Sequence, residues 1–238
     1  MVSTAVVMQA RTGSSRLPRK ALAPIGSRSL LGHCLVRLGL ARLRLIVATT
    51  TLAEDDAIEM EARTYGAEVF RGDAYDVLGR YLATAETFGL TEIVRATGDN
   101  PFVDADAPLR VTEFRRRFDA DYVTERGLPV GVAVEAVSVD ALRRASVLIV
   151  DPYDREHVTS FIRRDRRFRA VSTMAPGHLR RPGLRLTVDT LTDLEFVRGV
   201  HARLDSNEDP PGTPQVIRAA SSLLATERQL KQKMYATR

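Results

Sequence analysis

The sequence predicts an α/β fold in which a mainly parallel sheet carries helices on both faces. Two patterns lead to this prediction. Short runs of apolar and β-branched residues alternate with segments of helical periodicity through the first half of the chain. Glycines follow two of those helical segments, at Gly66 and Gly89, where they are typical of helix ends. A β-α-β-α order of this kind makes successive strands parallel, because each helical crossover returns the chain to the same end of the sheet.

The first half contains the clearest strand and helix signals. Apolar runs predict the strands, and the spacing of Leu31, Leu35 and Leu38 is typical of one face of a helix. The strands are expected at Val6–Gln9, Arg44–Thr49, Glu68–Arg71 and Glu92–Thr97, and the helices at Leu30–Leu40, Asp55–Tyr65 and Asp76–Phe88.

The second half is less regular, and residues 126–182 are expected to form a small β-rich subdomain within one domain that spans residues 1–238. The expected elements are a hairpin or long strand at Val130–Val139, a short helix that begins at Asp140–Arg144, a helix at Asp154–Arg164, and strands at Arg169–Thr173 and Leu184–Val188. Thr190–Asp193 resembles a capping box that opens a helix to about Leu204. A polar loop at Asn207–Pro214 is expected to precede a final helical segment.

Length and composition describe an ordinary globular chain. Its 238 residues, 44% hydrophobic and 27% charged, suffice to bury one substantial core. Cys34 is the single cysteine, which excludes an internal disulfide and favours a cytoplasmic location. No stretch approaches the ~20 consecutive apolar residues of a membrane span, and no secretory signal pattern opens the chain.

The net charge of +5 is unevenly distributed. Acidic residues dominate 51–76, whereas arginines dominate 163–185. Few aromatic residues interleave with those arginines, so a platform for single-stranded nucleic acid is poorly supported. The arginine-rich stretch is interpreted as a solvated face, with attraction of an anionic substrate as the alternative.

The most informative segment lies near the N-terminus. The apolar run Thr4–Ala10 opens into Arg11–Lys20, a loop with one glycine, three hydroxyl side chains and four cations. Such a loop after a buried strand offers backbone N–H groups and fixed positive charge to a polyphosphate. Lys20 is one of only three lysines among 35 basic residues, and a lysine supplies a compact point charge where arginine supplies a planar fork. The loop therefore predicts nucleotide handling.

Two aspartates are expected at the same edge of the sheet as this loop. Asp99 and Asp189 each follow an apolar strand and precede a turn or cap. An aspartate in that position is often only a turn former. Two carboxylates beside phosphate oxygens, however, form a hard oxygen site that suits Mg²⁺, so the pair predicts a magnesium site.

Other nucleotide and metal motifs are missing from the sequence. The loop matches neither the Walker A motif nor the dinucleotide fingerprint, which disfavours P-loop kinases and ordinary nicotinamide binding. One cysteine and four scattered histidines give no zinc spacing. His33 and His201 lie on expected helices and are interpreted as structural, whereas His157 follows Glu156 in a polar neighbourhood.

The segment Gln9–Lys20 closely resembles the opening of the cytidylyltransferases that activate acidic sugars, which include the 3-deoxy-manno-octulosonate and acylneuraminate enzymes. The SpsF-like spore coat polysaccharide proteins are the nearest branch. The resemblance continues at Val47–Thr50, Val69–Gly72, Asp76–Leu78, Thr97–Pro101, Glu156–Thr159 and Leu186–Thr190. These segments run from residue 9 to residue 190, so the resemblance covers most of the chain.

The resemblance implies a Rossmann-like nucleotidyltransferase of glycosyltransferase-A type, usually a homodimer. Such an enzyme transfers CMP from CTP to an acidic sugar or phosphonate-like acceptor and releases pyrophosphate. The implied catalytic residues are Arg11, Arg16, Lys20 and Asp99, with Asp99 and Asp189 as Mg²⁺ ligands. Nucleotide contacts are expected at Ala10, Gly13, Ser14, Ser15, Arg71 and Thr97, and acceptor contacts at Glu135, Glu156, His157 and Arg185. Residues 126–182 would serve acceptor binding or dimerisation. Arg19 departs from the family, which usually has glycine there.

Three alternatives stay open at this point. The chain could be a sugar-phosphate nucleotidyltransferase that uses UTP or GTP, a glycosyltransferase that consumes an activated sugar, or a nucleotide-binding protein without catalysis. The presence of Lys20, Asp99 and Asp189 argues against the last of these. Pyrophosphate release, measured with each of the four nucleoside triphosphates, Mg²⁺ and candidate acceptors, would separate them.

Overall fold

The computed structural model describes residues 2–204 and 210–236, and strands alternate with helices through the first half as the sequence predicts. The elements, with η for short 3₁₀-helices, are β1 (Thr4–Gln9), η1 (Lys20–Leu22), β2 (Pro24–Ile25), β3 (Arg28–Ser29), α1 (Leu30–Gly39), β4 (Arg44–Thr50), η2 (Ala53–Asp55), α2 (Asp56–Thr64), β5 (Glu68–Gly72), α3 (Val77–Thr87), β6 (Glu92–Thr97), α4 (Ala107–Arg117), β7 (Tyr122–Arg126), β8 (Glu135–Ser138), α5 (Val139–Leu148), α6 (Pro152–His157), α7 (Ser160–Arg164), β9 (Ala170–Met174), η3 (Gly177–Leu179), α8 (Leu191–His201) and α9 (Thr213–Ala236).

One mixed sheet organises the described residues, with seven strands in the order β5-β4-β1-β6-β8-β7-β9. Strands β5, β4, β1 and β6 are parallel, β8 is antiparallel to both neighbours, and β9 is parallel to β7. The mainly parallel α/β fold is therefore confirmed. Strands β8 and β9 of the expected subdomain, residues 126–182, extend this same sheet. Their role in acceptor binding or dimerisation stays a prediction.

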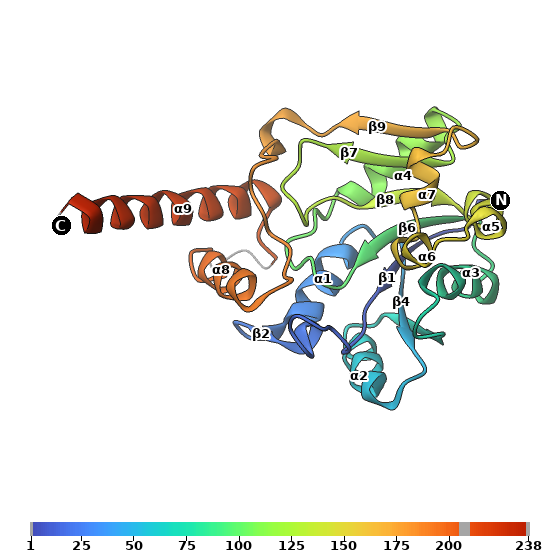
Figure 1. Cartoon of the computed structure of the whole chain (residues 1–238), viewed down its shortest axis with the longest axis horizontal. Helices are drawn as coiled ribbons and strands as arrows, with labels where there is room; N and C mark the ends of the chain where they lie inside the picture. The colour runs from blue at the N-terminus through green and yellow to red at the C-terminus, as the bar shows by residue number, and fades with distance from the viewer. Residues whose placement is uncertain (1, 205–209, 237–238) are drawn as a thin grey trace.

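Helices cover both faces of the sheet (Figure 1). Alternate residues of β1 reach opposite cores: Val6 and Met8 join the cluster under α1, α2, α4 and α8, whereas Ala5 and Val7 join the cluster under α3, α5 and α7. All four are fully buried. A central parallel strand is covered on both sides, which explains why its sequence is a continuous apolar run rather than an alternating one.

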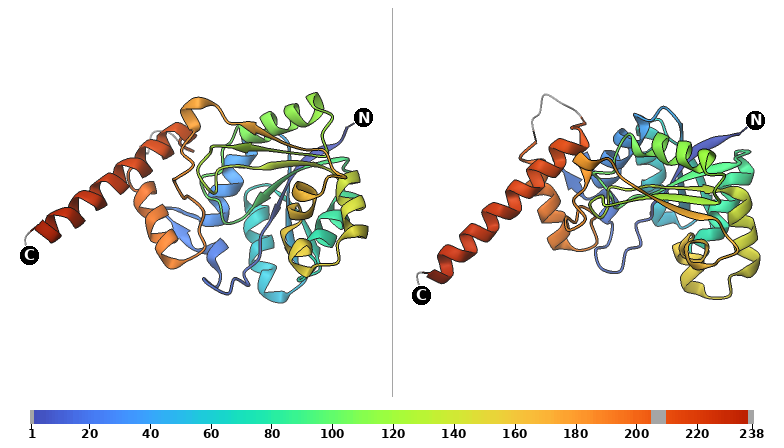
Figure 2. Two further views of the ribbon diagram at one scale, coloured as in Figure 1. Left: turned by 45° about the horizontal axis from the view of Figure 1, so that its top comes forward. Right: turned by 90° about the horizontal axis from the view of Figure 1, so that it is seen from above.

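Helix α9 extends away from the body of the molecule (Figure 2). Val216, Ile217, Ala220 and Leu223 anchor its first turns in the core. No helix within residues 2–204 and 210–236 combines the length and the apolar character needed to cross a bilayer.

Several second-half elements differ from the prediction. The expected helix Asp154–Arg164 is two short helices, α6 and α7, because Val158 has a φ of 55° and breaks the hydrogen-bond ladder between them. Leu184–Val188 is not a strand; Arg185 makes only an isolated bridge with Val130. The strand within Val130–Val139 is limited to β8, which lies antiparallel between β6 and β7. The capping box of Thr190 and Asp193 is confirmed at the start of α8.

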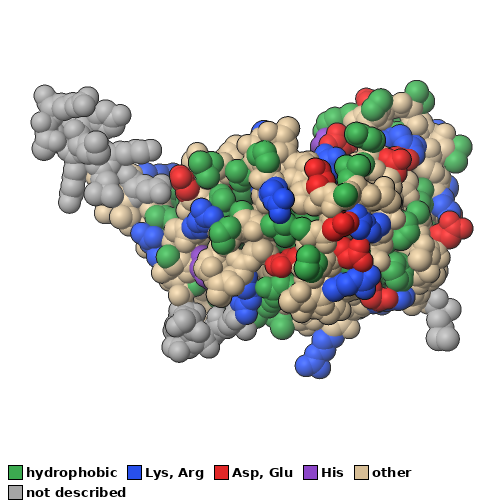
Figure 3. Space-filling model, turned by 90° about the horizontal axis from the view of Figure 1, so that it is seen from below, with side chains coloured by type: hydrophobic (Ala, Val, Ile, Leu, Met, Phe, Trp, Pro, Cys, Tyr) green, Lys and Arg blue, Asp and Glu red, His purple; other side chains and the backbone are tan. Residues whose placement is uncertain are grey.

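Carboxylates neutralise part of the arginine-rich stretch at 163–185. Arg164 pairs with Asp154, Arg167 with Asp165 at 2.6 Å, and Arg185 with Asp189 at 2.5 Å. The free positive charge of residues 163–185 is therefore smaller than their arginine count indicates. On the face that is seen from below in Figure 3, basic and acidic side chains are interspersed as well.

Candidate active site

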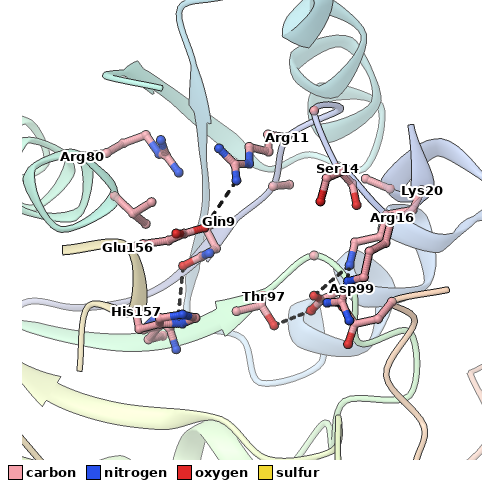
Figure 4. A pocket seen from close by; sticks show the side chains of 18 residues that line it. Gln9, Arg11, Ser14, Arg16, Lys20, Arg80, Thr97, Asp99, Glu156 and His157 are labelled. Carbon is pink, nitrogen blue, oxygen red and sulfur yellow. Dashed lines mark hydrogen bonds and ion pairs between the residues drawn. The ribbon is translucent and has the colours of Figure 1, made fainter. Parts of the chain in front are cut away.

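A pocket of about 340 Å³ opens at the carboxyl ends of β1 and β6 (Figure 4). This is the edge of the sheet where open α/β folds bind ligands. The pocket brings together most of the sequence-predicted site residues: Ala10, Arg11, Gly13, Ser14, Ser15, Arg16, Lys20, Thr97, Asp99, Glu156, His157 and Asp189. Gly98 begins the turn that carries Asp99, and a Cβ at Gly98 would lie 2.9 Å from the Cβ of Ala10, so a larger side chain there would push the two segments apart.

The loop between β1 and η1 forms one wall of the pocket. The carbonyl oxygen of Thr12 accepts hydrogen bonds from the N–H groups of Ser14, at 2.8 Å, and Arg19, at 2.9 Å, and this closes the loop on itself. Arg19 has a φ of 58°, which lies in the left-handed region that favours glycine. A glycine would adopt this backbone freely, whereas the arginine adopts it at some cost.

Lys20 lies between the two aspartates at one end of the pocket. Its Nζ is 3.2 Å from Asp99 Oδ2 and 3.2 Å from Asp189 Oδ1, and it donates to the carbonyl oxygen of Val188 at 2.8 Å. Arg16 Nη2 lies 2.9 Å from the same oxygen of Asp189. Burial alone would raise the pKa of Asp189, but Lys20, Arg185 and Arg16 together outweigh it and hold that pKa below its usual range.

The two aspartates come from segments ninety residues apart that the backbone joins directly. The N–H of Val188 donates to the carbonyl oxygen of Asp99 at 2.9 Å, and Thr97 Oγ1 donates to Asp99 Oδ1 at 2.6 Å. One ammonium group touches both carboxylates, so their oxygens are close enough to share a single cation. Two carboxylates are also the protein ligands that Mg²⁺ uses when phosphates and water complete its shell. The donor set therefore fits a magnesium ion, although the described residues include no cluster of three or more His, Cys, Asp or Glu side chains that could hold a metal.

The other end of the pocket combines the loop with α6. Arg11 points toward Glu156 in Figure 4, with 3.6 Å between Nη2 and Oε1, and Arg11 Nη1 donates to the carbonyl oxygen of Ala74 at 3.3 Å. His157, the last residue of α6, packs against the ring of Tyr153 with 4.0 Å between ring centroids. The break in the helix at residue 158 thus leaves Glu156 and His157 at the pocket.

Three of the expected site residues do not line the pocket. Glu135 is mostly buried and pairs with Arg95, which separates it from the pocket lining, with 2.8 Å between Glu135 Oε2 and Arg95 Nη1. Arg185 pairs with Asp193 and with Asp189, and of these three residues only Asp189 lines the pocket. Arg71 donates to the carbonyl oxygens of Thr50 and Leu52 and pairs with two carboxylates of α2, Asp56 and Glu59. Their roles in binding the nucleotide or the acceptor stay predictions.

Sequence reasoning missed Arg80 and Arg95, which both line the pocket. Arg95 Nη2 donates to Gln9 Oε1 at 3.1 Å. Burial would lower the pKa of Arg95, but the charge and hydrogen bond of Glu135, together with Tyr81 and Tyr122, outweigh burial and raise that pKa. Arg80 is only 2% exposed, and burial lowers its pKa. Both arginines could have been recognised as cations within otherwise apolar positions. Arg95 lies in the largely buried strand β6, and Arg80 lies on the buried side of α3 beside Tyr81.

Comparison with known proteins confirms the family resemblance. A sequence profile of the cytidylyltransferase family matches residues 5–236. The spore coat polysaccharide biosynthesis protein SpsF of Bacillus subtilis (strain 168) is 35% identical over 214 residues, 85% of this chain and 88% of that protein. A cytidylyltransferase structure from Leptospira borgpetersenii serovar Hardjo-bovis has a TM-score of 0.86 at 28% identity, over 94% of this chain and 96% of that one. CMP:2-keto-3-deoxy-manno-octonic acid synthetase in complex with CTP shares the fold, with a TM-score of 0.63 at 19% identity, over 84% of this chain and 98% of that one. The chain therefore belongs to the cytidylyltransferase family.

Proposed function

We propose that the protein transfers CMP from CTP to a small anionic acceptor, an acidic sugar or a phosphonate-like molecule, and releases pyrophosphate. Membership of the family supports the cytidylyl group as the group transferred. One observation carries the chemistry: the Nζ of Lys20 lies 3.2 Å from a carboxylate oxygen of Asp99 and of Asp189, beside a hydroxyl-rich loop. Cations that neutralise phosphate oxygens and carboxylates that can hold a metal ion are recurring parts of phosphoryl-transfer sites.

The loop end of the pocket would hold the triphosphate. Arg16 and Lys20 supply positive charge there, and Gly13, Ser14 and Ser15 line the same wall. Negative charge accumulates on the β-phosphate as the bond from the α-phosphorus to the bridging oxygen breaks. The two cations lie where they would offset that charge, and Lys20 is already held in place by three oxygens.

Asp99 and Asp189 would hold Mg²⁺ in the presence of CTP. The ion would supply positive charge to the triphosphate. Binding of a nucleotide would require Lys20 and Arg16 to exchange part of their present contacts with the carboxylates for phosphate oxygens. Charge balance favours this exchange, because a triphosphate and a divalent cation replace the ion pairs that now hold the site together.

The α6 end of the pocket would hold the acceptor. An oxygen of the acceptor forms a bond to the α-phosphorus as pyrophosphate leaves. Both reactants are anionic, so neutralisation and alignment should supply most of the rate enhancement. Arg11 and Arg95 line this region as cations, and Glu156 and His157 offer polar contacts for hydroxyl groups.

The test is pyrophosphate release with each of the four nucleoside triphosphates, Mg²⁺ and a panel of acidic sugars, with neutral sugars and sugar phosphates as controls. The proposal expects release with CTP and an acidic acceptor, and a cytidine monophosphate adduct detectable by mass spectrometry. Release with UTP or GTP and a sugar phosphate would instead support the alternative nucleotidyltransferase. Hydrolysis or transfer from a nucleotide sugar would support the glycosyltransferase.

A further inference from the structure

A buried carboxylate stands behind the phosphate-binding loop. Asp55, the last residue of η2, is 0% exposed. Its Oδ1 accepts from the N–H of Thr12 at 2.6 Å and from the hydroxyl of Thr12 at 2.7 Å, and its Oδ2 accepts from the hydroxyl of Thr50. One side chain of the β4–α2 connection therefore holds the start of the loop and the end of β4 together.

Thr12 is the residue through which this contact controls the loop. Arg11 and Gly13 on either side of it line the pocket, whereas Thr12 is only 3% exposed and faces the interior. Its carbonyl oxygen accepts from the N–H of Arg19, the residue before Lys20. The position of Thr12 thus determines the position of both ends of the loop, and with its second end the position of Lys20.

The connection that carries Asp55 is itself braced. Arg71 on β5 donates to the carbonyl oxygens of Thr50, at 2.9 Å, and Leu52, at 2.8 Å. It also pairs with Asp56 Oδ1 at 2.5 Å, next to Asp55 in the chain. Arg71 does not line the pocket, and its contacts are those of a residue that stabilises this turn.

We infer that Asp55 is a positioning residue for triphosphate binding, which acts through Thr12 on the loop that carries Arg11, Arg16 and Lys20. The inference rests on the proposed function. Asp55 touches no reacting atom; it holds the N–H groups and cations of the loop in the arrangement that a triphosphate needs. The three donors that converge on it are all satisfied by a carboxylate, whereas an amide would direct its own N–H₂ group at one of them.

The test is the affinity for inorganic triphosphate with Mg²⁺, and for CTP with Mg²⁺, measured by titration calorimetry together with the melting temperature of each variant. Asp55→Asn should weaken both affinities about tenfold or more, on the scale of one mismatched buried hydrogen bond. Thr12→Val, which removes the hydroxyl at similar volume, should weaken them about fivefold, and Thr12→Ser, which keeps both donors, should stay within about twofold of the wild type.

Asp104 supplies the matched control. It is a buried carboxylate that accepts from Arg110 and Thr213 at 2.5 Å each and does not line the pocket. Asp104→Asn should lower the melting temperature without changing triphosphate affinity. If Asp55→Asn and Thr12→Val lower the melting temperature but leave the triphosphate affinity unchanged, as expected of this control, the inference is wrong and Asp55 is purely structural. A wild type that binds triphosphate but not CTP would contradict the proposed function and leave the role of Asp55 intact, whereas one that binds neither would overturn both.

Discussion

Replacement of Lys20 tests the proposed chemistry most directly. The Lys20 side chain is 15% exposed, and its ammonium touches Asp99 and Asp189 at 3.2 Å and the carbonyl oxygen of Val188 at 2.8 Å. Lys20→Met keeps the unbranched stem of the side chain as far as Cε and removes the ammonium group with its charge and donors. Two carboxylates would then face the incoming triphosphate without the cation that lies between them.

The expected loss follows from the place of that charge. One oriented charged donor at the developing negative charge of a transition state contributes about 2.7–4 kcal/mol, which corresponds to a fall in kcat of about 10²–10³-fold. Lys20→Arg should also be impaired, because the three oxygens surround a point charge rather than lying in the plane of a guanidinium fork. In the Lys20→Met protein the pKa of Asp189 should rise, since the hydrogen bond from Lys20 now holds it low.

The assay is pyrophosphate release from saturating CTP and Mg²⁺, with circular dichroism and thermal unfolding as checks that each variant is folded. Arg19→Gly is the matched control, because it removes an exposed cation one residue away that does not line the pocket. A folded Lys20→Met protein with the kcat of the wild type would refute the proposed role of the loop. Full activity of Lys20→Arg would show that any cation suffices at this position.

Four further predictions test the metal, the base, the buried ion pair and the loop. Asp99→Asn and Asp189→Asn should each raise the Mg²⁺ concentration needed for half-maximal activity. If the Asp189→Asn protein shows the same Mg²⁺ dependence as the wild type, Asp189 holds no metal and serves only the turn before α8. CTP should be preferred over UTP by at least ~10-fold in kcat/KM, because a site that pairs with the cytosine edge leaves groups mismatched with uracil, and equal use of both would exclude a cytidine-specific site. Burial alone would raise the pKa of Glu135, but Arg95 and the hydroxyl donors of Tyr122 and Thr159 together lower it, so the unfolded chain binds more protons in acid. The free energy of unfolding should therefore fall as the pH drops below about 4.5, and less steeply in Glu135→Gln, as urea unfolding at several pH values would measure. Arg19→Gly should raise the free energy of unfolding by about 0.5–1 kcal/mol, because relief of the left-handed arginine exceeds the entropy that glycine adds to the unfolded chain; a clear loss of stability would contradict the strain argument.

Local signals in the sequence were sufficient for the parallel half of the sheet. The runs that predicted β1, β4, β5 and β6 are strands within two residues of their expected bounds. The central strand β1 is the clearest of them, since it is covered on both faces and its fully buried residues are all apolar. The capping box of Thr190 and Asp193 is likewise local, because both partners lie within one helical turn. The loop at Arg11–Lys20 and the aspartates at 99 and 189 stood out by composition and by their place after apolar runs.

Elements that depend on distant partners were not predictable in the same way. Helix α4 and strand β7 were absent from the prediction; α4 is held in part by Arg115 and Arg116, which pair with the buried Glu92 of β6. Val158 interrupts the expected helix with a positive φ that no β-branched residue favours by itself, so its surroundings must impose it.

The sequence by itself determined which segments form the parallel strands, the loop expected to bind phosphate and the family, because these depend on short contiguous patterns. Only the tertiary structure decided which side chains share the pocket. It placed Lys20 between carboxylates 79 and 169 residues away, turned Glu135 and Arg71 away from the pocket lining, and added Arg80 and Arg95 to it. The physical reason is that a charged side chain on a buried face must find partners or a ligand there, and those partners come from other segments of the chain.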